Sequence, residues 1–271
     1  MTISGGIKFF DKSKSLLKDG ATIAASTNDA AADFVLSMNR NIRWDSVGSD
    51  DITTETLTIT FDSAKTIDRI LLVGINAKAF QIKYNTSTDF ANVVTLDGTE
   101  STINITGFDK DTAYFEFDAV SATNIVITID TTQVVDAEKF ITMVIPTAEI
   151  GTLTGYPGVE PLTRANEKRA MTQSGRFVTQ KGFEAFSAKL SLEHTIQADV
   201  TVFNTLFESQ PPFLVWLCGG NFGTTYFSVE LKNWRLKDLY QVQTLGEIET
   251  NFRNNIYTSS PMTSLQLAEE V

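Results

Sequence analysis

The side chains that most often act as nucleophiles, bases or metal ligands are scarce in this sequence. Among 271 residues, His194 is the only histidine and Cys218 is the only cysteine. A catalytic serine would have to use His194 as its base, and no Gly-x-Ser-x-Gly turn accompanies it. A structural zinc site normally draws four ligands from cysteine and histidine, which this chain cannot supply. We therefore expect no catalytic residues, no metal, no cofactor, no intramolecular disulfide and no enzymatic activity.

Carboxylates, in contrast, are abundant. The chain has 33 Asp and Glu against 22 Lys and Arg, and a net charge of −11. A glycosidase needs two carboxylates across a cleft at a defined separation, so abundance alone does not indicate one. We expect Asp50-Asp51 and the pair Asp109/Asp111 to lie in solvated turns. The negative net charge argues against a nucleic-acid partner, because surfaces that bind phosphate are usually basic.

Aromatic side chains could offer flat faces to sugar rings. Trp44, Trp216 and Trp234 are the three tryptophans, and their apolar neighbours favour packing in the core. Trp44 is the best candidate for a glycan contact, because it adjoins the loop 46–52. We expect His194 to be a hydrogen-bonded structural residue, and Cys218, beside Trp216, to pack as a small hydrophobe.

A basic segment is the sharpest functional signal. Within eighteen residues that contain only one acid, Glu167, the chain carries five bases: Arg164, Lys168, Arg169, Arg176 and Lys181. Arginine can make paired bonds to carboxylates, so an extended arm here could lie on the acidic surface of a neighbouring subunit. An ordinary solvated linker is the alternative.

Strand patterns dominate the first half of the chain. In 55–61, Leu57, Ile59 and Phe61 alternate with threonines, which is typical of a half-buried strand. Similar alternation at 80–84, 103–105 and 125–129 predicts further strands, and 70–73 is predicted to be buried on both faces. Residues 28–38 could form a short helix capped by Asn28 or an irregular loop.

The second half begins where the strand pattern lapses, between Ile150 and Gly182, in a stretch interrupted by glycine and proline. Charge also changes near residue 150: residues 1–150 carry 21 acids and 12 bases, and residues 151–271 carry 12 and 10. Strands are predicted at 186–192, 213–217, 226–231, 234–242 and 247–257, with 213–217 and 226–231 forming a hairpin. A short helix is predicted at 198–207.

Two features concern membranes and export. The longest apolar stretches, 70–75 and 213–218, are far shorter than the roughly 20 residues of a membrane-spanning helix. The N-terminal residues lack the basic region and apolar core of a secretory signal. We therefore expect no membrane partner and no secretory signal.

Residues 41–152 resemble the discoidin family, or coagulation factor 5/8 C-type domains, which are galactose-binding-like jelly rolls. The resemblance is carried by Trp44-Asp45-Ser46, the strand 57–61, the run 67–76, the strand 80–84 and the closing segment 148–151. It implies a β-sandwich whose loops, in several family members, bind sugars or lipid headgroups. The disulfide that commonly ties the ends of that fold is missing here, so ligand binding is not carried over.

Residues 174–265 resemble tail-tip or baseplate proteins of tailed bacteriophages in the order of their elements, from the strand near 186–192 to the segment 234–240. This resemblance implies a role in assembly and assigns no particular residue.

Together these observations predict an all-β protein. A discoidin-like jelly-roll sandwich would span 1–152, a basic extended linker or arm 153–182, and a β-barrel or sandwich with one short helix 183–271. We expect a structural virion protein of a tailed bacteriophage, assembled in the host cytoplasm with other tail or baseplate proteins in a homo-oligomeric ring. The alternative is a carbohydrate-binding, receptor-engaging module of a phage tail, or a secreted glycan-active protein.

Overall fold

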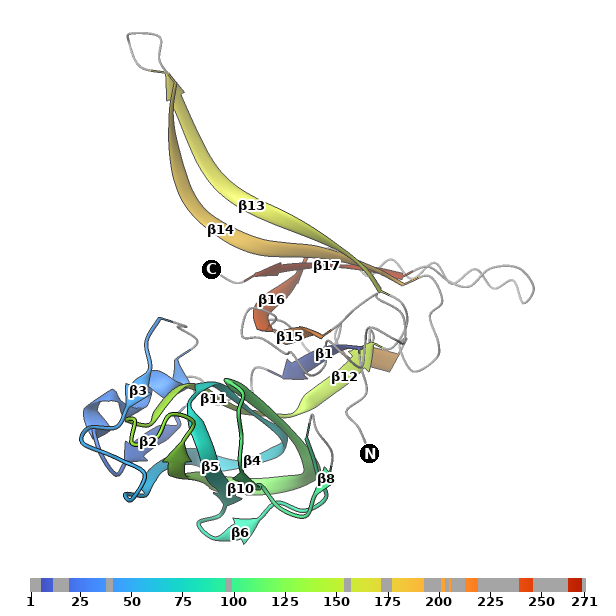
Figure 1. Ribbon diagram of the computed structural model, residues 1–271. Helices are drawn as coiled ribbons and strands as arrows, with labels where there is room; N and C mark the ends of the chain where they lie inside the picture. Colours follow the sequence, from blue (N-terminus) through green and yellow to red (C-terminus); the bar gives the residue numbers. More distant parts are fainter. Residues whose placement is uncertain are drawn as a thin grey trace. The chain divides into compact units, whose positions relative to one another are not determined.

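The computed structural model describes residues 6–11, 20–37, 41–95, 99–153, 157–171, 177–192, 201–202, 205, 213–218, 239–245 and 263–269. The chain divides into two compact units (Figure 1). The first holds the described residues from Phe10 to Glu149, and the second holds residues 6–9 together with the described residues from Ile150 onward. Strands dominate both units, so the predicted all-β fold is confirmed.

The first unit is built on two long antiparallel strands, β4 (Glu55–Ile75) and β10 (Thr112–Thr132). Their register shifts between Glu116 and Val120 and again between Ala122 and Asn124. Such bulges bend a strand, so the two halves of the pair can enclose a core between them. Side chains from both halves, such as Ile59 and Leu72, do belong to one apolar cluster. The unit is therefore an antiparallel sandwich, as predicted.

Shorter strands flank this pair. The main order of the sheet is β3-β11-β4-β10-β5-β6, with β2 paired to β4, β7 to β10 and β8, and β9 to β5. Their bounds are β2 (Thr22–Ala25), β3 (Trp44–Asp45), β5 (Ala77–Tyr84), β6 (Thr88–Asp89), β7 (Val93–Thr95), β8 (Thr99–Glu100), β9 (Asn104–Thr106) and β11 (Phe140–Thr147).

The predicted strand patterns match the burial. Leu57, Ile59 and Phe61 are buried while the intervening threonines are not. Residues 70–73 are all at most 1% exposed, which confirms a strand covered on both faces. Burying each such side chain contributes about 1.5 to 3 kcal/mol.

The ambiguous segment 28–38 contains a 3-10 helix, η1 (Asp29–Leu36). Because such a helix has three residues per turn, Ala32 and Val35 share its buried side, while Phe34 is 40% exposed. Asn28 makes no capping bond with its side chain, which instead donates to the carbonyl of Asp45 over 2.8 Å.

The second unit contains a sheet whose seven described strands have the order β12-β1-β15-β16-β17-β14-β13. These strands are β1 (Gly6–Asp11), β12 (Glu149–Leu153), β13 (Pro157–Met171), β14 (Phe177–Leu192), β15 (Phe213–Cys218), β16 (Leu239–Leu245) and β17 (Thr263–Glu269).

The prediction that the strand pattern lapses between Ile150 and Gly182 is wrong, because β13 and the beginning of β14 lie there. β13 and β14 form a long antiparallel hairpin that starts with Pro157 opposite Leu192 and ends with Met171 opposite Phe177. Pro157 and Pro161 are tolerated because β13 is an edge strand of the described sheet, where a missing N–H need not break a ladder. Gly182 lies where the register shifts, which is a common position for glycine.

Other predictions for the second half meet the structure only in part. The strand at 213–217 is confirmed as β15, but the hairpin partner predicted for it, 226–231, lies outside the described residues. The described neighbours of β15 are β1 and β16. Residues 201, 202 and 205 are helical, and the other residues of the predicted helix 198–207 lie outside the described residues. The described residues also exclude His194, Trp234 and the strand predicted at 247–257.

Candidate functional site

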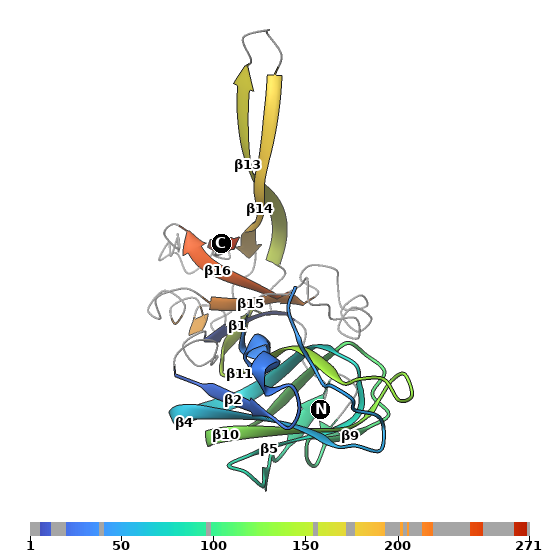
Figure 2. The ribbon, with the colours of Figure 1, turned by 90° about the vertical axis from the view of Figure 1, so that its left-hand side faces the viewer.

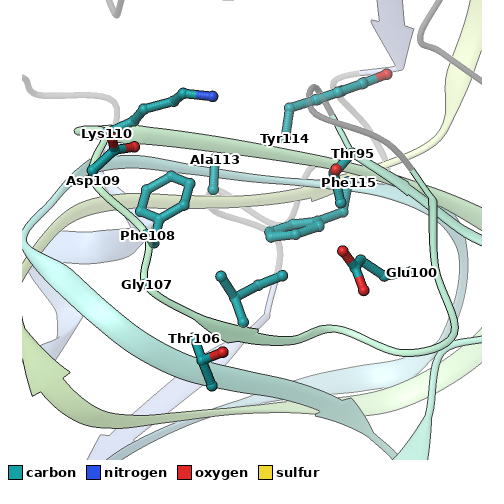
Figure 3. A pocket seen from close by; sticks show the side chains of 11 residues that line it. Thr95, Glu100, Thr106, Gly107, Phe108, Asp109, Lys110, Ala113, Tyr114 and Phe115 are labelled. Atoms are coloured by element: carbon teal, nitrogen blue, oxygen red, sulfur yellow. The ribbon is translucent and has the colours of Figure 1, made fainter.

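A pocket of about 190 Å³ opens on the first unit (Figure 3). It is formed by β7, β8, β9, the loop 107–110 and the beginning of β10. The residues that line it are Thr95, Glu100, Ile105, Thr106, Gly107, Phe108, Asp109, Lys110, Ala113, Tyr114 and Phe115.

The floor of the pocket is apolar and firmly placed. The ring of Phe108 meets that of Phe80 edge to face with 5.5 Å between centroids, and Phe80 meets Phe115 in the same way at 6.1 Å. The backbone N–H groups of Gly107 and Phe108 both donate to the carbonyl of Lys78, over 2.9 and 2.8 Å. Gly107 has a φ of +90°, which glycine adopts readily. The turn therefore holds Phe108 against the core.

The rim of the pocket is polar. Glu100, Thr106 and Asp109 are exposed, and Figure 3 shows the Glu100 carboxylate near the ring of Phe115 and the Asp109 carboxylate near Phe108. An apolar floor with a few polar groups around it is the usual composition of a small-ligand site. Carboxylates accept hydrogen bonds from hydroxyl or amino groups, and the ring faces suit an apolar ring.

No pattern in the sequence predicted this pocket. Asp109 and Asp111 were expected to lie in a solvated turn, and both are exposed. Phe108, which forms much of the floor, carried no recognisable pattern. The only local signal was the turn at Thr106-Gly107 directly before this aromatic residue.

Trp44, the predicted glycan contact, is fully buried. Its indole N–H donates to the carbonyl of Thr27 over 3.0 Å. The side chain thus offers no face to a ligand, so the glycan prediction is wrong for this residue, and the core-packing interpretation is confirmed. The cause is η1 and its preceding turn, which bring Thr27 to the indole.

A second polar cluster surrounds Arg69. Its guanidinium is 2.9 Å from a carboxylate oxygen of Glu149 and 3.6 Å from one of Glu116. The Tyr114 hydroxyl donates to Glu116 over 2.9 Å. Burial raises the pKa of Asp68, which lies beside Arg69, and burial together with Glu116 raises the pKa of the Tyr114 hydroxyl. The Arg69 Nε is buried without a hydrogen bond, but the charged groups of the cluster pair with one another, so we interpret the cluster as structural.

The predicted basic residues fall on the hairpin. Arg164, Lys168 and Arg169 are on β13 and Lys181 is on β14, while Arg176 lies outside the described residues. In the register, Lys181 is opposite Glu167, Lys168 is opposite Gln180, and Arg169 is opposite Thr179. The fold therefore gathers the basic segment onto one ribbon.

In the described part of the chain, no group of three or more Cys, His, Asp or Glu residues could hold a metal ion. No helix among those residues is long and apolar enough to cross a membrane.

No protein-family model matches this sequence. No curated protein matches it either. Solved structures similar to about half of the chain include a selenomethionine-labelled mutant of chitosan-binding module 1 of a chitosanase/glucanase from Paenibacillus sp. IK-5, with 16% identity and a TM-score of 0.39, covering 49% of this chain and 98% of that one. Another is the family 32 carbohydrate-binding module of NanJ from C. perfringens in complex with galactose. It has 18% identity and a TM-score of 0.37, and the match covers 52% of this chain and 98% of that one.

A third is a module from Clostridium perfringens in complex with GalNAc-β-1,3-galactose, with 10% identity and a TM-score of 0.36, covering 49% and 99%. At these identities and TM-scores, the three structures do not indicate what this chain binds. None of the three is a phage protein, and the resemblance of the second half to tail proteins stays a prediction.

Proposed function

We propose that this chain is a structural subunit that joins a larger protein assembly through the β13–β14 hairpin. The observation that carries the proposal is the outer ribbon, residues 163–171 of β13 and 177–186 of β14. β17 pairs with β14 only from Ser187 to Leu192. Beyond that point the described sheet is two strands wide (Figure 2).

A ribbon of this kind is poorly stabilised by itself. An isolated two-stranded hairpin is at best marginally stable in water, and a third strand or a covering layer is needed for independent stability. The nine β13 residues from 163 to 171, at about 3.3 Å each, give the outer ribbon a length of roughly 30 Å. Both of its edges have backbone groups without a described strand neighbour, which favours pairing with another chain. A partner protein that covers the ribbon would supply such a layer.

The more specific form of the proposal is a tail, baseplate or collar component of a tailed bacteriophage, assembled in the host cytoplasm and carried in the virion. It is supported by the sequence resemblance of residues 174–265 alone. Co-expression with tail and baseplate proteins, followed by affinity capture of this chain, tests it. Capture of a tail protein would support this form, and capture of none would count against it while leaving the general proposal open to other partners.

The hairpin proposal is tested by shortening the ribbon. A variant in which residues 163–186 are replaced by Asn-Gly keeps the six pairs between β13 and β14 that β17 supports. We expect this variant to lose association with partner subunits while the first unit retains its unfolding midpoint. Association as strong as that of the full chain would overturn the proposal.

The pocket on the first unit favours a second candidate function, carbohydrate binding. Its volume, aromatic floor and carboxylate rim suit one sugar residue with hydroxyl or amino substituents. Calorimetric titration with a panel of mono- and disaccharides tests this, with the double variant Glu100→Gln/Asp109→Asn expected to weaken binding at least roughly tenfold. The matched control is Asp118→Asn, which changes an exposed carboxylate outside the pocket. Equal binding by all three proteins, or none by any, would reject this candidate.

A further inference from the structure

Two loops of the first unit lie side by side at the ends of long strands. We name residues 46–53 and 130–138 the loop pair. The N–H of Gly48 donates to the carboxylate of Glu138 over 3.2 Å, and the N–H and hydroxyl of Thr132 both donate to Asp51 over 2.9 Å. These bonds join residues more than eighty positions apart in the sequence into one surface.

The loop pair exposes aliphatic side chains. Six large apolar residues are exposed in the described part of the chain, and four of them are on these loops: Val47 at 64%, Ile52 at 91%, Val134 at 70% and Val135 at 75%. Single exposed apolar residues are normal on a protein surface, but a concentration of them commonly marks an interaction site.

The loops are held rigid from beneath by Lys139. This lysine is fully buried, and its ammonium group donates to the Ser49 hydroxyl (2.7 Å) and to the carbonyls of Asp50 (2.5 Å) and Thr53 (2.8 Å). The backbone N–H of Ser46 donates to the carbonyl of Lys139, and the backbone N–H of Lys139 donates to the Ser46 hydroxyl, both over 2.8 Å. A surface that is ordered before binding loses little conformational entropy on binding, so its apolar contacts contribute more fully to affinity.

The charge of the loop pair selects the kind of partner. The two segments contain five acids and no base: Asp50, Asp51, Asp130, Asp136 and Glu138. An anionic lipid surface or a nucleic acid would be repelled. The outer ribbon, residues 163–171 and 177–186, contains four bases and two acids, a net charge of +2 on a chain whose total is −11. Met171, at the end of β13, is 67% exposed and offers an apolar contact next to this positive charge.

We propose that the loop pair is a docking surface for the β13–β14 hairpin of a second copy of this chain. The inference deepens the proposed function, on which it rests, by naming both the partner and the receiving surface. Positive charge on the hairpin would meet the carboxylates of the loops, and aliphatic side chains would form the dry centre of the contact. The contact is heterologous, because the hairpin of one copy meets the loop pair of another. Repetition of this contact would produce either a closed ring or an open filament.

Sedimentation velocity of the full chain at several concentrations and two salt concentrations tests the inference. We expect self-association that weakens at high salt, because the attraction between exposed charges is screened. The variant Ile52→Ser/Val135→Ser should associate at least roughly tenfold more weakly. Its matched controls are Phe34→Ser, which removes an exposed apolar side chain elsewhere, and Asp33→Lys, which changes exposed charge elsewhere.

A charge swap separates direct docking from an indirect effect. The hairpin variant Lys168→Glu/Arg169→Glu and the loop variant Asp130→Lys/Glu138→Lys should each fail to self-associate. Mixed together, they should form complexes, because the unchanged hairpin of the loop variant still fits the unchanged loops of the hairpin variant, and the two reversed surfaces also complement each other.

Other outcomes would overturn the inference. A mixture that stays monomeric, a wild-type chain that is monomeric at every concentration, or binding of the loop pair to phosphatidylserine vesicles instead of to the chain would each do so. Self-association that depends on the outer ribbon but ignores every loop variant would reject the docking surface alone. If neither the full chain nor the variant without the outer ribbon associates with any partner, the proposed function itself is rejected.

Discussion

The molecule contains two long antiparallel strand pairs that differ in what surrounds them. β4 and β10 have strands β2, β11, β5 and β7 along their outer edges, and their side chains enclose one apolar cluster. β13 and β14 are also long and also contain a register shift, yet over residues 163–171 and 177–186 they pair only with each other among the described strands. The first pair can therefore be stable within one molecule, whereas the second needs a covering layer.

The difference between the two pairs shows that long paired strands do not by themselves form an apolar core. Hydrogen bonds between two strands replace bonds to water and contribute little net stability, whereas burial of apolar area contributes most of it. A long pair that has no further described strand on either edge is therefore informative, because it fits the proposal that this ribbon makes contacts with another protein. The following experiments address this difference.

Hydrogen exchange should show the largest contrast. Backbone amides in the central part of β4 and β10 should open only with a free energy close to that of global unfolding, about 5 kcal/mol or more. Amides of the outer ribbon should open with about 1 kcal/mol in the monomer, since none of the other described strands pairs with this part of the hairpin. On assembly, the ribbon amides should become protected. Equal protection of both regions in the monomer would contradict the comparison.

The next largest effect should come from Lys139→Met. This change leaves the Ser49 hydroxyl and the carbonyls of Asp50 and Thr53 without their donor, so the first unit should lose about 3 kcal/mol of unfolding free energy. Urea denaturation measures the loss. The control Lys78→Met changes an exposed lysine and should stay within about 0.5 kcal/mol of the parent. Equal losses for the two variants would show that the buried ammonium does not organise the loops.

Gly74→Ala should have a somewhat smaller effect, of about 2 kcal/mol. Gly74 has a φ of +61°, and an added Cβ would lie 2.7 Å from the Cβ of Thr142 on β11. Gly107→Ala is the matched variant, since its φ is +90° but no heavy atom lies within 4 Å. It should cost about 1 kcal/mol, from backbone strain alone. If Gly107→Ala costs as much as Gly74→Ala, close packing between β4 and β11 is not the cause.

Much of the first unit could be predicted because its signals are local. The alternation of Leu57, Ile59 and Phe61, and the fully apolar run at 70–73, directly specify which side of a strand is buried. The sandwich follows once such strands recur along the chain. The turn at Gly107 was also expected from its residue types.

The predictions that failed depended on contacts distant in sequence. Proline and glycine in 153–182 were interpreted as a break in the strand pattern, because a sequence does not show that Pro157 and Pro161 lie on an edge strand. Core packing of Trp44 was predicted from its apolar neighbours, but its place beside the loop 46–52 did not show that the indole N–H is taken up by the Thr27 carbonyl. The pocket was not predicted because it is formed by short segments of β7, β8, β9 and β10. The role of Lys139 was not predicted because no local pattern marks a lysine as buried.

The smallest effect concerns Asp51 of the loop pair. The backbone N–H of Thr132, above all, holds the pKa of this carboxyl below its ordinary value of 3.8, although partial desolvation opposes the shift. A lowered pKa in the folded state means that the contact stabilises the fold above pH 3.8 and loses this contribution as the pH falls through the folded value. The amide resonance of Thr132 should therefore titrate with a midpoint below 3.8. The titration should disappear in Asp51→Asn, and a midpoint above 3.8 would contradict the assignment.

The position of β1 in the second unit has a consequence for synthesis. β1 is made early, yet its neighbours in the sheet are β12 and β15, which the ribosome delivers only after the whole first unit. The first unit can close its own core in the meantime, because β4, β10 and β11 are complete by Thr147. β1 must wait for partners that are distant in sequence, a kind of closure that is slow. The apolar residue Phe9, which is fully buried in the finished fold, is therefore without its final surroundings while the first unit is being translated.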